Sequence, residues 1–176
     1  MRNLFPALVA GAALLGGCAS YTKDMGKATT GPVAIASLRT ATGADVGRAT
    51  ARQTKGGLRL TVDVMGMPPG EHGAHIHAVG RCDPTDFMTA GGHWNPAATK
   101  HGLMNPAGPH EGDLPNLIVG NDGHGTLGVT IKGATMAGLL DSDGSAMIVH
   151  AARDDQVSDP SGNSGARIAC GVFALN

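Results

Sequence analysis

Strict alternation of apolar and polar residues constrains this chain more than any other feature. In residues 58–64, LRLTVDV, four apolar side chains fall on one face of an extended segment, and Arg59, Thr61 and Asp63 fall on the other. The same pattern recurs in residues 126–132, TLGVTIK. Because successive side chains of a β-strand point to opposite faces, both segments predict strands that are buried on one side only.

Six further segments have the length and apolar content of strands. Gly, Pro and Asn separate them, and a chain with 28 glycines, 10 prolines and 3% aromatic residues does not suit a helix bundle. We therefore expect an all-β fold, an eight-stranded antiparallel Greek-key β-barrel or sandwich without an amphipathic helix. The six segments are residues 32–39, 46–52, 74–79, 116–120, 146–151 and 166–175.

Two segments break this rhythm of short strands. Residues 80–115 and 151–166 are rich in Gly, Pro, Asn and Asp and show no alternation. A long loop without structure of its own is uncommon in a compact domain unless something orders it. Loops on a rigid β scaffold also tend to carry function. Both segments are therefore predicted to be functional loops.

The first residues are typical of an export signal. Residues 1–17 contain one Arg followed by an apolar stretch that is too short to span a bilayer, which predicts a signal peptide. The sequence LGGC, ending at Cys18, resembles a bacterial lipobox, in which the cysteine is lipidated; a plain signal peptide cut elsewhere is the alternative. Residues 18–31 are expected to form a flexible tether, and residues 32–176 one domain. These features predict a periplasmic protein that is anchored to the outer membrane.

Charge and cysteine content limit the partners and the compartment. A formal net charge of −1 gives no basic excess for a nucleic-acid partner. If lipidation uses Cys18, the other two cysteines, Cys82 and Cys170, are an even pair, for which a disulfide is the default in an oxidising compartment. Two free buried thiols are the alternative.

Three of the eight histidines fall on predicted strands. His75 and His77 flank Ile76, so both imidazoles project from one face of the strand while the isoleucine points into the core. His150 ends the apolar run of residues 146–151. If these two strands are neighbours, three imidazoles meet at one point, and nitrogen-only ligation suits Cu(II).

The first long loop carries a different set of ligand types. His93, His101, His110 and Asp113 offer three nitrogens and one carboxylate oxygen, a good tetrahedral zinc set. A bound metal would also order the loop. A lone histidine is more often a solvated or hydrogen-bonded side chain, so it is the conjunction of both patterns that indicates metal binding.

Together these motifs resemble those of a copper,zinc superoxide dismutase of the bacterial exported kind. The matching stretches are GEHGAHIHAVGRC, GGHWNP, KHG, PHEGDLPN, MIVHA and GARIACGV, which cover residues 32–176 in family order. The resemblance implies a β-sandwich architecture. It also implies bound copper and zinc, and conversion of superoxide to dioxygen and hydrogen peroxide.

The resemblance further implies a role for each site residue. Copper would be held by four histidines and zinc by three histidines and an aspartate, with one histidine shared as a bridge that also carries a proton. Arg167 would attract superoxide at the mouth of the copper site. Cys82 would pair with Cys170. The implied ligands are His75, His77, His93 and His150 for copper, and His93, His101, His110 and Asp113 for zinc.

Other residues have weaker assignments. Asp154 matches a family aspartate that hydrogen-bonds a ligand histidine at each metal, with Asp155 as the competing candidate. His72 matches a histidine with a structural, hydrogen-bonding role, and His124 matches nothing. Candidates for steering the anion from the surface are Arg81, Lys100 and Arg153.

Two functions are compatible with these residues, and a third fits them less well. The first is a superoxide dismutase, and the second is a non-catalytic copper- and zinc-binding lipoprotein on the same fold. A zinc hydrolase would need an open coordination position, whereas the loop set already fills four. The expected partners are superoxide and, through lipidated Cys18, a membrane; both a monomer and a homodimer stay open.

Overall fold

The computed structural model describes residues 31–176. The expected signal peptide, Cys18 and nearly all of the expected tether fall in residues 1–30 and lie outside the described residues. Within residues 31–176, no helix is long and apolar enough to traverse a bilayer.

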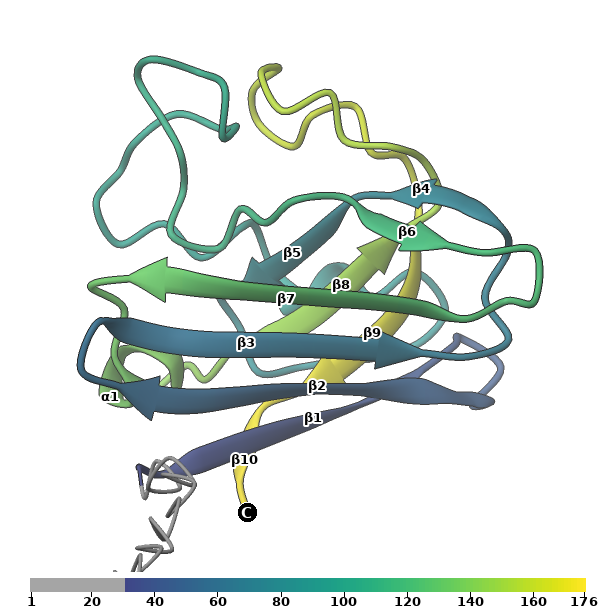
Figure 1. The fold of residues 1–176 in the computed structure, drawn as a ribbon, viewed down its shortest axis with the longest axis horizontal. Coiled ribbons are helices and arrows are strands. Elements are labelled where there is room, and N and C mark those ends of the chain that lie inside the picture. Colours follow the sequence, from purple (N-terminus) through teal and green to yellow (C-terminus); the bar gives the residue numbers. More distant parts are fainter. Residues whose placement is uncertain (1–30) are drawn as a thin grey trace, which may run out of the picture.

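Ten strands and two single-turn helices make up the described chain (Figure 1). The strands are β1 (Val33–Arg39), β2 (Asp45–Thr54), β3 (Gly57–Val64), β4 (Gly70–His72), β5 (Ala74–His77), β6 (Leu117–Val119), β7 (Gly125–Lys132), β8 (Ala146–His150), β9 (Arg167–Val172) and β10 (Ala174–Leu175). The helices are the 3-10 turn η1 (Met88–Ala90) and α1 (Met136–Leu139).

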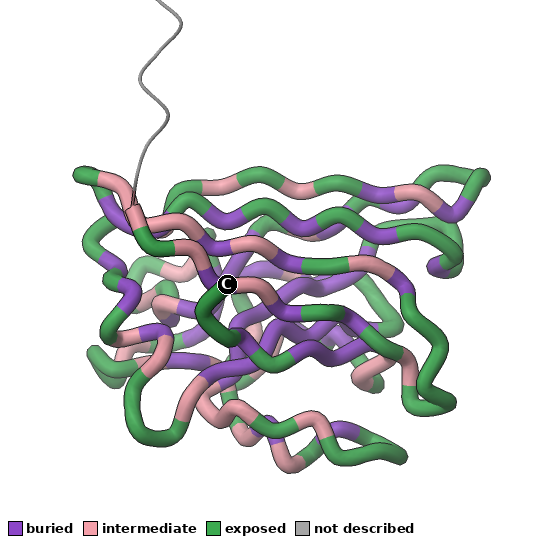
Figure 2. Tube along the Cα trace, turned by 90° about the horizontal axis from the view of Figure 1, so that it is seen from below, coloured by how far each residue is buried: buried purple, intermediate pink, exposed green. Residues whose placement is uncertain are grey.

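The alternation in the sequence becomes the two faces of the strands. In β3 the four apolar side chains are fully buried, while Arg59, Thr61 and Asp63 are exposed. Buried and exposed residues alternate in the same way along neighbouring strands in Figure 2. The apolar faces meet in one main core, which includes Leu38, Leu60 and Ile76. The predicted all-β antiparallel architecture is confirmed.

The strands form one antiparallel sheet that nearly closes on itself. Its order is β4-β6-β7-β3-β2-β1-β9-β8-β5, with β10 paired to β1. The two strands at the ends of this path, β4 and β5, are consecutive in the chain and are separated only by Gly73. The chain itself therefore joins the two ends of the sheet next to the strand that carries His75 and His77, and the barrel is nearly closed.

Gly73 is required by close packing at this closure. Its N–H donates to the carbonyl of Ala152 (2.8 Å), and its own carbonyl accepts from the N–H of His150 (2.8 Å). A Cβ at this position would lie 2.5 Å from Oγ of Ser164. A larger residue would push the second long loop away from the ends of β5 and β8.

The structure differs from the sequence prediction in three details. The three-residue strand β4 was not expected, because its residues GEH have no apolar alternation and it forms only by pairing with β6. The last expected strand is divided into β9 and β10 at Phe173, whose N–H donates to the carbonyl of Ser145. The four-residue helix α1, capped by Thr135, is too short to have a detectable period. Because β4 and β5 form one segment, the expected eight strands are retained.

The first long loop is ordered by the free edge of β5. Ile76 donates to the carbonyl of Gly112 and accepts from the N–H of Trp94, and Trp94 and Gly112 bond to each other. Isolated bridges pair His75 with Asp113 and His77 with His93. Main-chain hydrogen bonds therefore place two stretches of the loop beside the strand histidines.

Candidate metal centre

Four histidine rings converge between the barrel wall and the first long loop. His75 and His77 project from β5 on the side opposite the core residue Ile76, as predicted, and all three are buried. β5 pairs with β8, which brings His150 alongside them, and His93 approaches from the loop. The ring centroid of His75 lies 4.0 Å from that of His93 and 4.8 Å from that of His150. We call these four residues the nitrogen group.

Each ring of the nitrogen group has one nitrogen without a partner. Nδ1 of His77 donates to the carbonyl of Gly91 (2.9 Å), and Nδ1 of His150 donates to the carbonyl of Gly165 (3.1 Å). Their protons therefore lie on Nδ1, and Nε2 keeps its lone pair. Within residues 31–176, the buried ring nitrogens that have no hydrogen-bond partner are Nδ1 of His75 and Nε2 of His77, His93 and His150. Four convergent lone pairs fit a metal that accepts nitrogen-only ligation.

Burial keeps three of these imidazoles, those of His77, His93 and His150, neutral in the metal-free protein. Burial lowers the pKa of His93 to about 4, and the neighbouring His75 adds to this effect while Asp113 opposes it. Burial and the nearby His75 lower the pKa of His150 to about 3. The pKa of His77 also lies well below the usual value, again mainly because of burial. Neutral imidazole is the form that binds a metal.

A second set of ligand atoms adjoins the first and shares one residue with it. Oδ1 of Asp113 lies 2.8 Å from Nδ1 of His93, 3.0 Å from Nδ1 of His101 and 3.3 Å from Nδ1 of His110. In each set the ligand atoms lie within 4.8 Å of one another. We call His93, His101, His110 and Asp113 the mixed group. Because His93 directs Nε2 to one set and Nδ1 to the other, it can bridge two ions.

The carboxylate of Asp113 is oriented by the loop backbone. Its Oδ2 accepts from the N–H of Gly102 (2.8 Å) and of His110 (2.9 Å), which leaves Oδ1 directed toward the three histidines. Burial alone would raise the pKa of Asp113, but the hydrogen bonds from His93 and the Gly102 amide reverse this, and the pKa lies well below its usual value. The group is therefore an anion that can neutralise part of a cation's charge.

Asp154 links the two groups from behind. Its Oδ2 lies 2.6 Å from Nε2 of His75, and its Oδ1 lies 3.1 Å from Nε2 of His101. Asp155 makes no such contact, because its carboxylate accepts from the backbone of Val157 and Ser158. Asp154, and not its neighbour, thus contacts one histidine of each group, which fixes the ring orientation and tautomer of both.

The remaining two histidines lie outside both groups. His72 is buried, with Nδ1 2.8 Å from the carbonyl of His150 and Nε2 2.8 Å from the carbonyl of Pro68. It therefore contacts the nitrogen group only through a backbone oxygen. His124 lies 3.7 Å from Asp63, at the far end of β3.

Arg167 stands beside the nitrogen group with its position fixed by two carbonyls. On β9 it pairs with His150 of β8, and its Nη1 and Nη2 donate to the carbonyls of Phe87 and Gly91, each at 2.7 Å. It lines a cavity of about 430 Å³ together with His77, His93 and His150. Burial lowers its pKa, with Asp86 opposing, but an arginine stays charged in proteins. The guanidinium therefore presents a fixed positive charge to the cavity.

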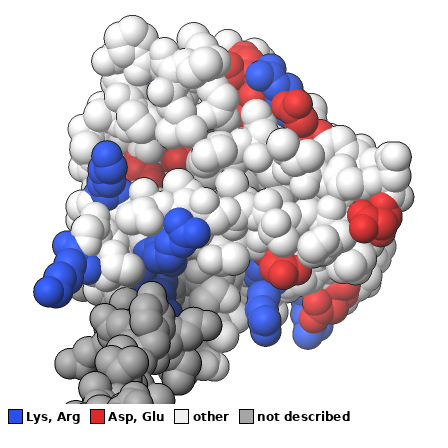
Figure 3. Space-filling model, in the orientation of Figure 1, with Lys and Arg blue, Asp and Glu red and all other residues white. Residues whose placement is uncertain are grey.

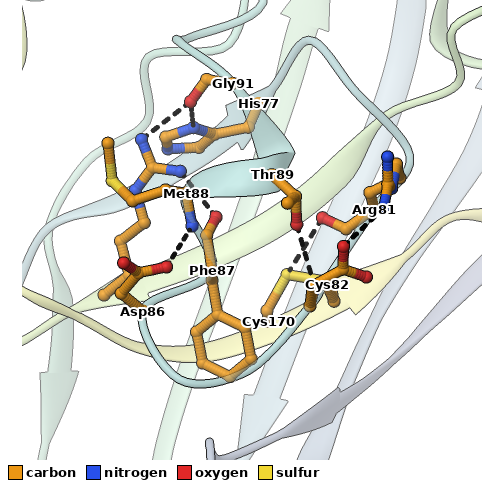
Figure 4. The surroundings of a disulfide bond; sticks show 11 residues. His77, Arg81, Cys82, Asp86, Phe87, Met88, Thr89, Gly91 and Cys170 are labelled. Carbon is orange, nitrogen blue, oxygen red and sulfur yellow. Dashed lines mark hydrogen bonds and ion pairs between the residues drawn. A yellow bond between two sulfur atoms is a disulfide. The ribbon is translucent and has the colours of Figure 1, made fainter.

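The loop whose backbone carbonyls bind Arg167 is cross-linked to the barrel. Cys82 and Cys170 form the expected disulfide, across a sequence separation of 88 residues. Figure 4 shows this bond beside Phe87, and it shows the carbonyl of Gly91 directed to His77 as well. Trp94 packs into the main core of the barrel, whereas Phe87 is buried in a small core against the disulfide. The cross-link and this core fix the carbonyls that orient Arg167.

The surface cations expected to steer an anion are each paired with a carboxylate. Arg81 bonds to Asp83, Lys100 to Asp159 and Arg153 to Glu71, and all three cations are well exposed. Their partners were not predicted, because two of the three pairs join segments that are distant in the sequence. Because the charges of each pair cancel, an approaching anion is attracted only weakly by these cations. Arg167 is thus the cation that matters for the cavity.

A β-barrel with two adjoining ligand groups that share one histidine defines a two-metal protein. Residues 46–173 match the family model described as copper/zinc superoxide dismutase. The chain is 43% identical over 136 residues to Cu-Zn superoxide dismutase 1 of Aquifex aeolicus, covering 74% of this chain and 80% of that one. It is 42% identical over 147 residues to the Cu-Zn superoxide dismutase of Caulobacter vibrioides, covering 80% and 84%. The chain therefore belongs to the copper/zinc superoxide dismutase family.

Solved structures agree with this assignment. A superoxide-dismutase-like protein from Bacillus subtilis superposes with a TM-score of 0.75 at 39% identity, covering 80% of this chain and 97% of that one. The Cu/Zn superoxide dismutase from Brucella abortus gives a TM-score of 0.68 at 30% identity, covering 81% and 99%. The likeness spans nearly the whole described domain.

Proposed function

We propose that this protein is a copper,zinc superoxide dismutase. The net reaction takes two superoxide anions and two protons to one dioxygen and one hydrogen peroxide. The observation that carries the proposal is the convergence of four unpartnered imidazole nitrogens beside a fixed arginine, in one cavity. A protein that only stored metal would not need an anion-binding group held by two carbonyls next to its ligands, so the non-catalytic binder is not favoured.

The ligand types assign one metal to each group. The nitrogen group, His75, His77, His93 and His150, suits copper, and the mixed group, His93, His101, His110 and Asp113, suits zinc. When bound, copper would supply a one-electron redox couple, and zinc would supply a fixed positive charge.

Arg167 and His93 are the residues that act on the substrate. The guanidinium of Arg167 has a fixed charge and planar donors, so it attracts superoxide into the cavity and orients it. His93 faces the cavity side of the site with Nε2, and its other nitrogen lies in the mixed group. When Nε2 is free it can hold a proton where the peroxide product needs one. Asp154 keeps the rings of His75 and His101 in place, and His72 holds the backbone carbonyl of His150.

The cellular location is proposed from the part of the chain that lies outside the described residues. The sequence of residues 1–18 supports export and lipidation at Cys18, with anchoring in the outer membrane and the domain in the periplasm. The disulfide between Cys82 and Cys170 is consistent with an oxidising compartment. Mass spectrometry of the N-terminal peptide from the membrane fraction tests this: an acylated Cys18 is expected, and an unmodified N-terminus downstream of Cys18 would contradict it.

The catalytic proposal is tested by following superoxide decay after pulse radiolysis. Protein loaded with copper and zinc is expected to accelerate the decay strongly, selective removal of copper should abolish the acceleration, and copper return should restore it. The variant His75→Ala should lose copper and activity while keeping the fold. Decay no faster than in free solution, with both metals bound, would overturn the proposal.

A further inference from the structure

The ligands of the mixed group are covered by the protein, so a zinc ion from solution approaches them through a cavity. His101, His110 and Asp113 are buried, and His93 is half-buried. Two cavities of the described chain border this group. His93 and His110 line the cavity that Arg167 also lines, whereas His110 and Asp113 line a second one. His110 therefore belongs to the wall of both cavities.

The second cavity lies between the first long loop and β7, and we call it the loop cavity. It has a volume of about 650 Å³, and apolar side chains such as Val129 and Ile131 of β7 form much of its wall. Leu103, Thr130 and Lys132 also line it, and all three are exposed. The loop cavity thus connects the solvent with two ligands of the mixed group.

Glu111 gives the loop cavity a carboxylate that is not a ligand of the mixed group. It follows His110 directly in the chain and is half-buried. Among residues 31–176 its carboxylate makes no hydrogen bond and no ion pair. Figure 3 shows acidic atoms partly covered by their neighbours between this loop and the strands below it, with a basic side chain beside them. Carboxylate oxygen is a zinc ligand, so the side chain can bind an arriving ion.

The charges in the other cavity oppose the entry of a cation. The guanidinium of Arg167 is held there by the carbonyls of Phe87 and Gly91, so its positive charge cannot move aside. An ion entering that way would also meet the unpartnered nitrogens of the nitrogen group, which can bind it. The cation that lines the loop cavity is Lys132, and because its side chain is exposed, solvent screens its charge.

We propose that zinc reaches the mixed group through the loop cavity and that Glu111 is its entry ligand, from which the ion passes to His110 and Asp113. This inference rests on the proposed assignment of zinc to the mixed group, and it does not depend on the catalytic step. Glu111 is not one of the four final ligands. It therefore lowers the barrier for entry and for exit alike, and it changes the equilibrium affinity little.

The test measures the rates of zinc binding and release in protein that already holds copper, so that the nitrogen group does not take up zinc. Stopped-flow mixing with Zn²⁺ and a fluorescent zinc indicator gives the association rate, and transfer to excess chelator gives the dissociation rate. Glu111→Gln should slow both by about tenfold and change the affinity less than about threefold. Lys132→Gln removes a like charge from the same cavity and should speed association by about twofold.

Glu71→Gln is the matched control, because Glu71 is the other glutamate of the chain and lines neither cavity. It should leave both zinc rates unchanged.

Three results would overturn the proposal. The first is an unchanged association rate in Glu111→Gln. The second is faster dissociation at an unchanged association rate, which would mean that Glu111 only stabilises bound zinc. The third is faster zinc binding by Arg167→Gln, which would place the entry path in the other cavity. A parent protein that binds no zinc would overturn the zinc assignment as well. Superoxide decay is measured on the same samples, so failure of the catalytic proposal is seen separately.

Discussion

The two ligand groups differ in what holds their side chains in place. In the nitrogen group, His75, His77 and His150 lie on β5 and β8, whose pairing continues through the whole barrel. The unshared ligands of the mixed group all come from residues 101–113, a loop without strands. Strand ladders fix a residue whether or not an ion is present, whereas a loop depends on its few internal contacts. The zinc group should therefore depend on its metal more than the copper group does.

The largest expected effect is that of Asp113→Ala. This change removes a ligand and also the acceptor of the Gly102 and His110 amides. We expect zinc affinity to fall by at least about 100-fold, with faster amide hydrogen exchange throughout residues 99–113. His75→Ala is the contrasting variant: copper is lost, but amide protection in this loop is retained. Equal loosening of the loop by both variants would break the distinction between the groups.

Acid should destabilise the metal-free protein well above the pH at which carboxylates titrate. Histidines of the unfolded chain titrate near pH 6.5, whereas burial lowers the pKa of His93 to about 4 and that of His150 to about 3. Below pH 6.5 the unfolded state binds more protons, so the stability that these neutral rings contribute is present at pH 7 and is lost as pH falls toward 4. We expect the free energy of unfolding to drop by on the order of 5 kcal/mol between pH 7 and 4.5.

Urea unfolding of the demetallated protein at several pH values checks this prediction. The variant His124→Gln, outside both groups, should leave the pH dependence unchanged. An unfolding free energy that stays constant from pH 7 to 4.5 would show that His93 and His150 bind protons equally in the folded and the unfolded protein, and would contradict the prediction.

A smaller effect on metal affinity, at both ligand groups, is expected for Asp154→Asn. This carboxylate contacts His75 of one group and His101 of the other, and an amide cannot accept through both of its atoms. We expect the affinities for copper and for zinc each to fall by about 10- to 100-fold. Asp155→Asn is the matched control and should change neither. If a competitive chelator titration shows a lower affinity for only one of the two metals, Asp154 does not stabilise both groups.

The smallest predicted effect is on the rate and not on the metals. In Arg167→Lys the positive charge is kept, but a single ammonium cannot hold the bidentate position set by the carbonyls of Phe87 and Gly91. We expect the second-order rate with superoxide to fall by about tenfold at unchanged metal content. Lys100→Met, whose charge Asp159 already neutralises, should change the rate less than about twofold. A larger effect at Lys100 would mean that steering from the surface dominates.

Features that depend on interactions within one strand could be predicted from the sequence, whereas features that depend on tertiary contacts could not. The alternation of β3 and the shared face of His75 and His77 are properties of a single strand, and the structure has both. Whether Asp154 or Asp155 contacts the histidines depends on the path of a loop. Because the two residues are adjacent and of the same type, the sequence does not distinguish them. The pairing of Lys100 with Asp159 joins two loops, and β4 forms only against β6. Such features arise from tertiary contacts, which a local pattern does not contain.

The central claim is that strand-borne nitrogens select copper while the loop-borne set selects zinc, with His93 between them. Anomalous diffraction from crystals of the metal-loaded protein, collected at the copper and zinc absorption edges, tests it most directly. We predict a copper peak bounded by His75, His77, His93 and His150, and a zinc peak on the other side of the His93 ring, bounded by His101, His110 and Asp113. Zinc in both positions under conditions of equal supply, or a single ion that leaves one nitrogen of His93 unligated, would contradict the account.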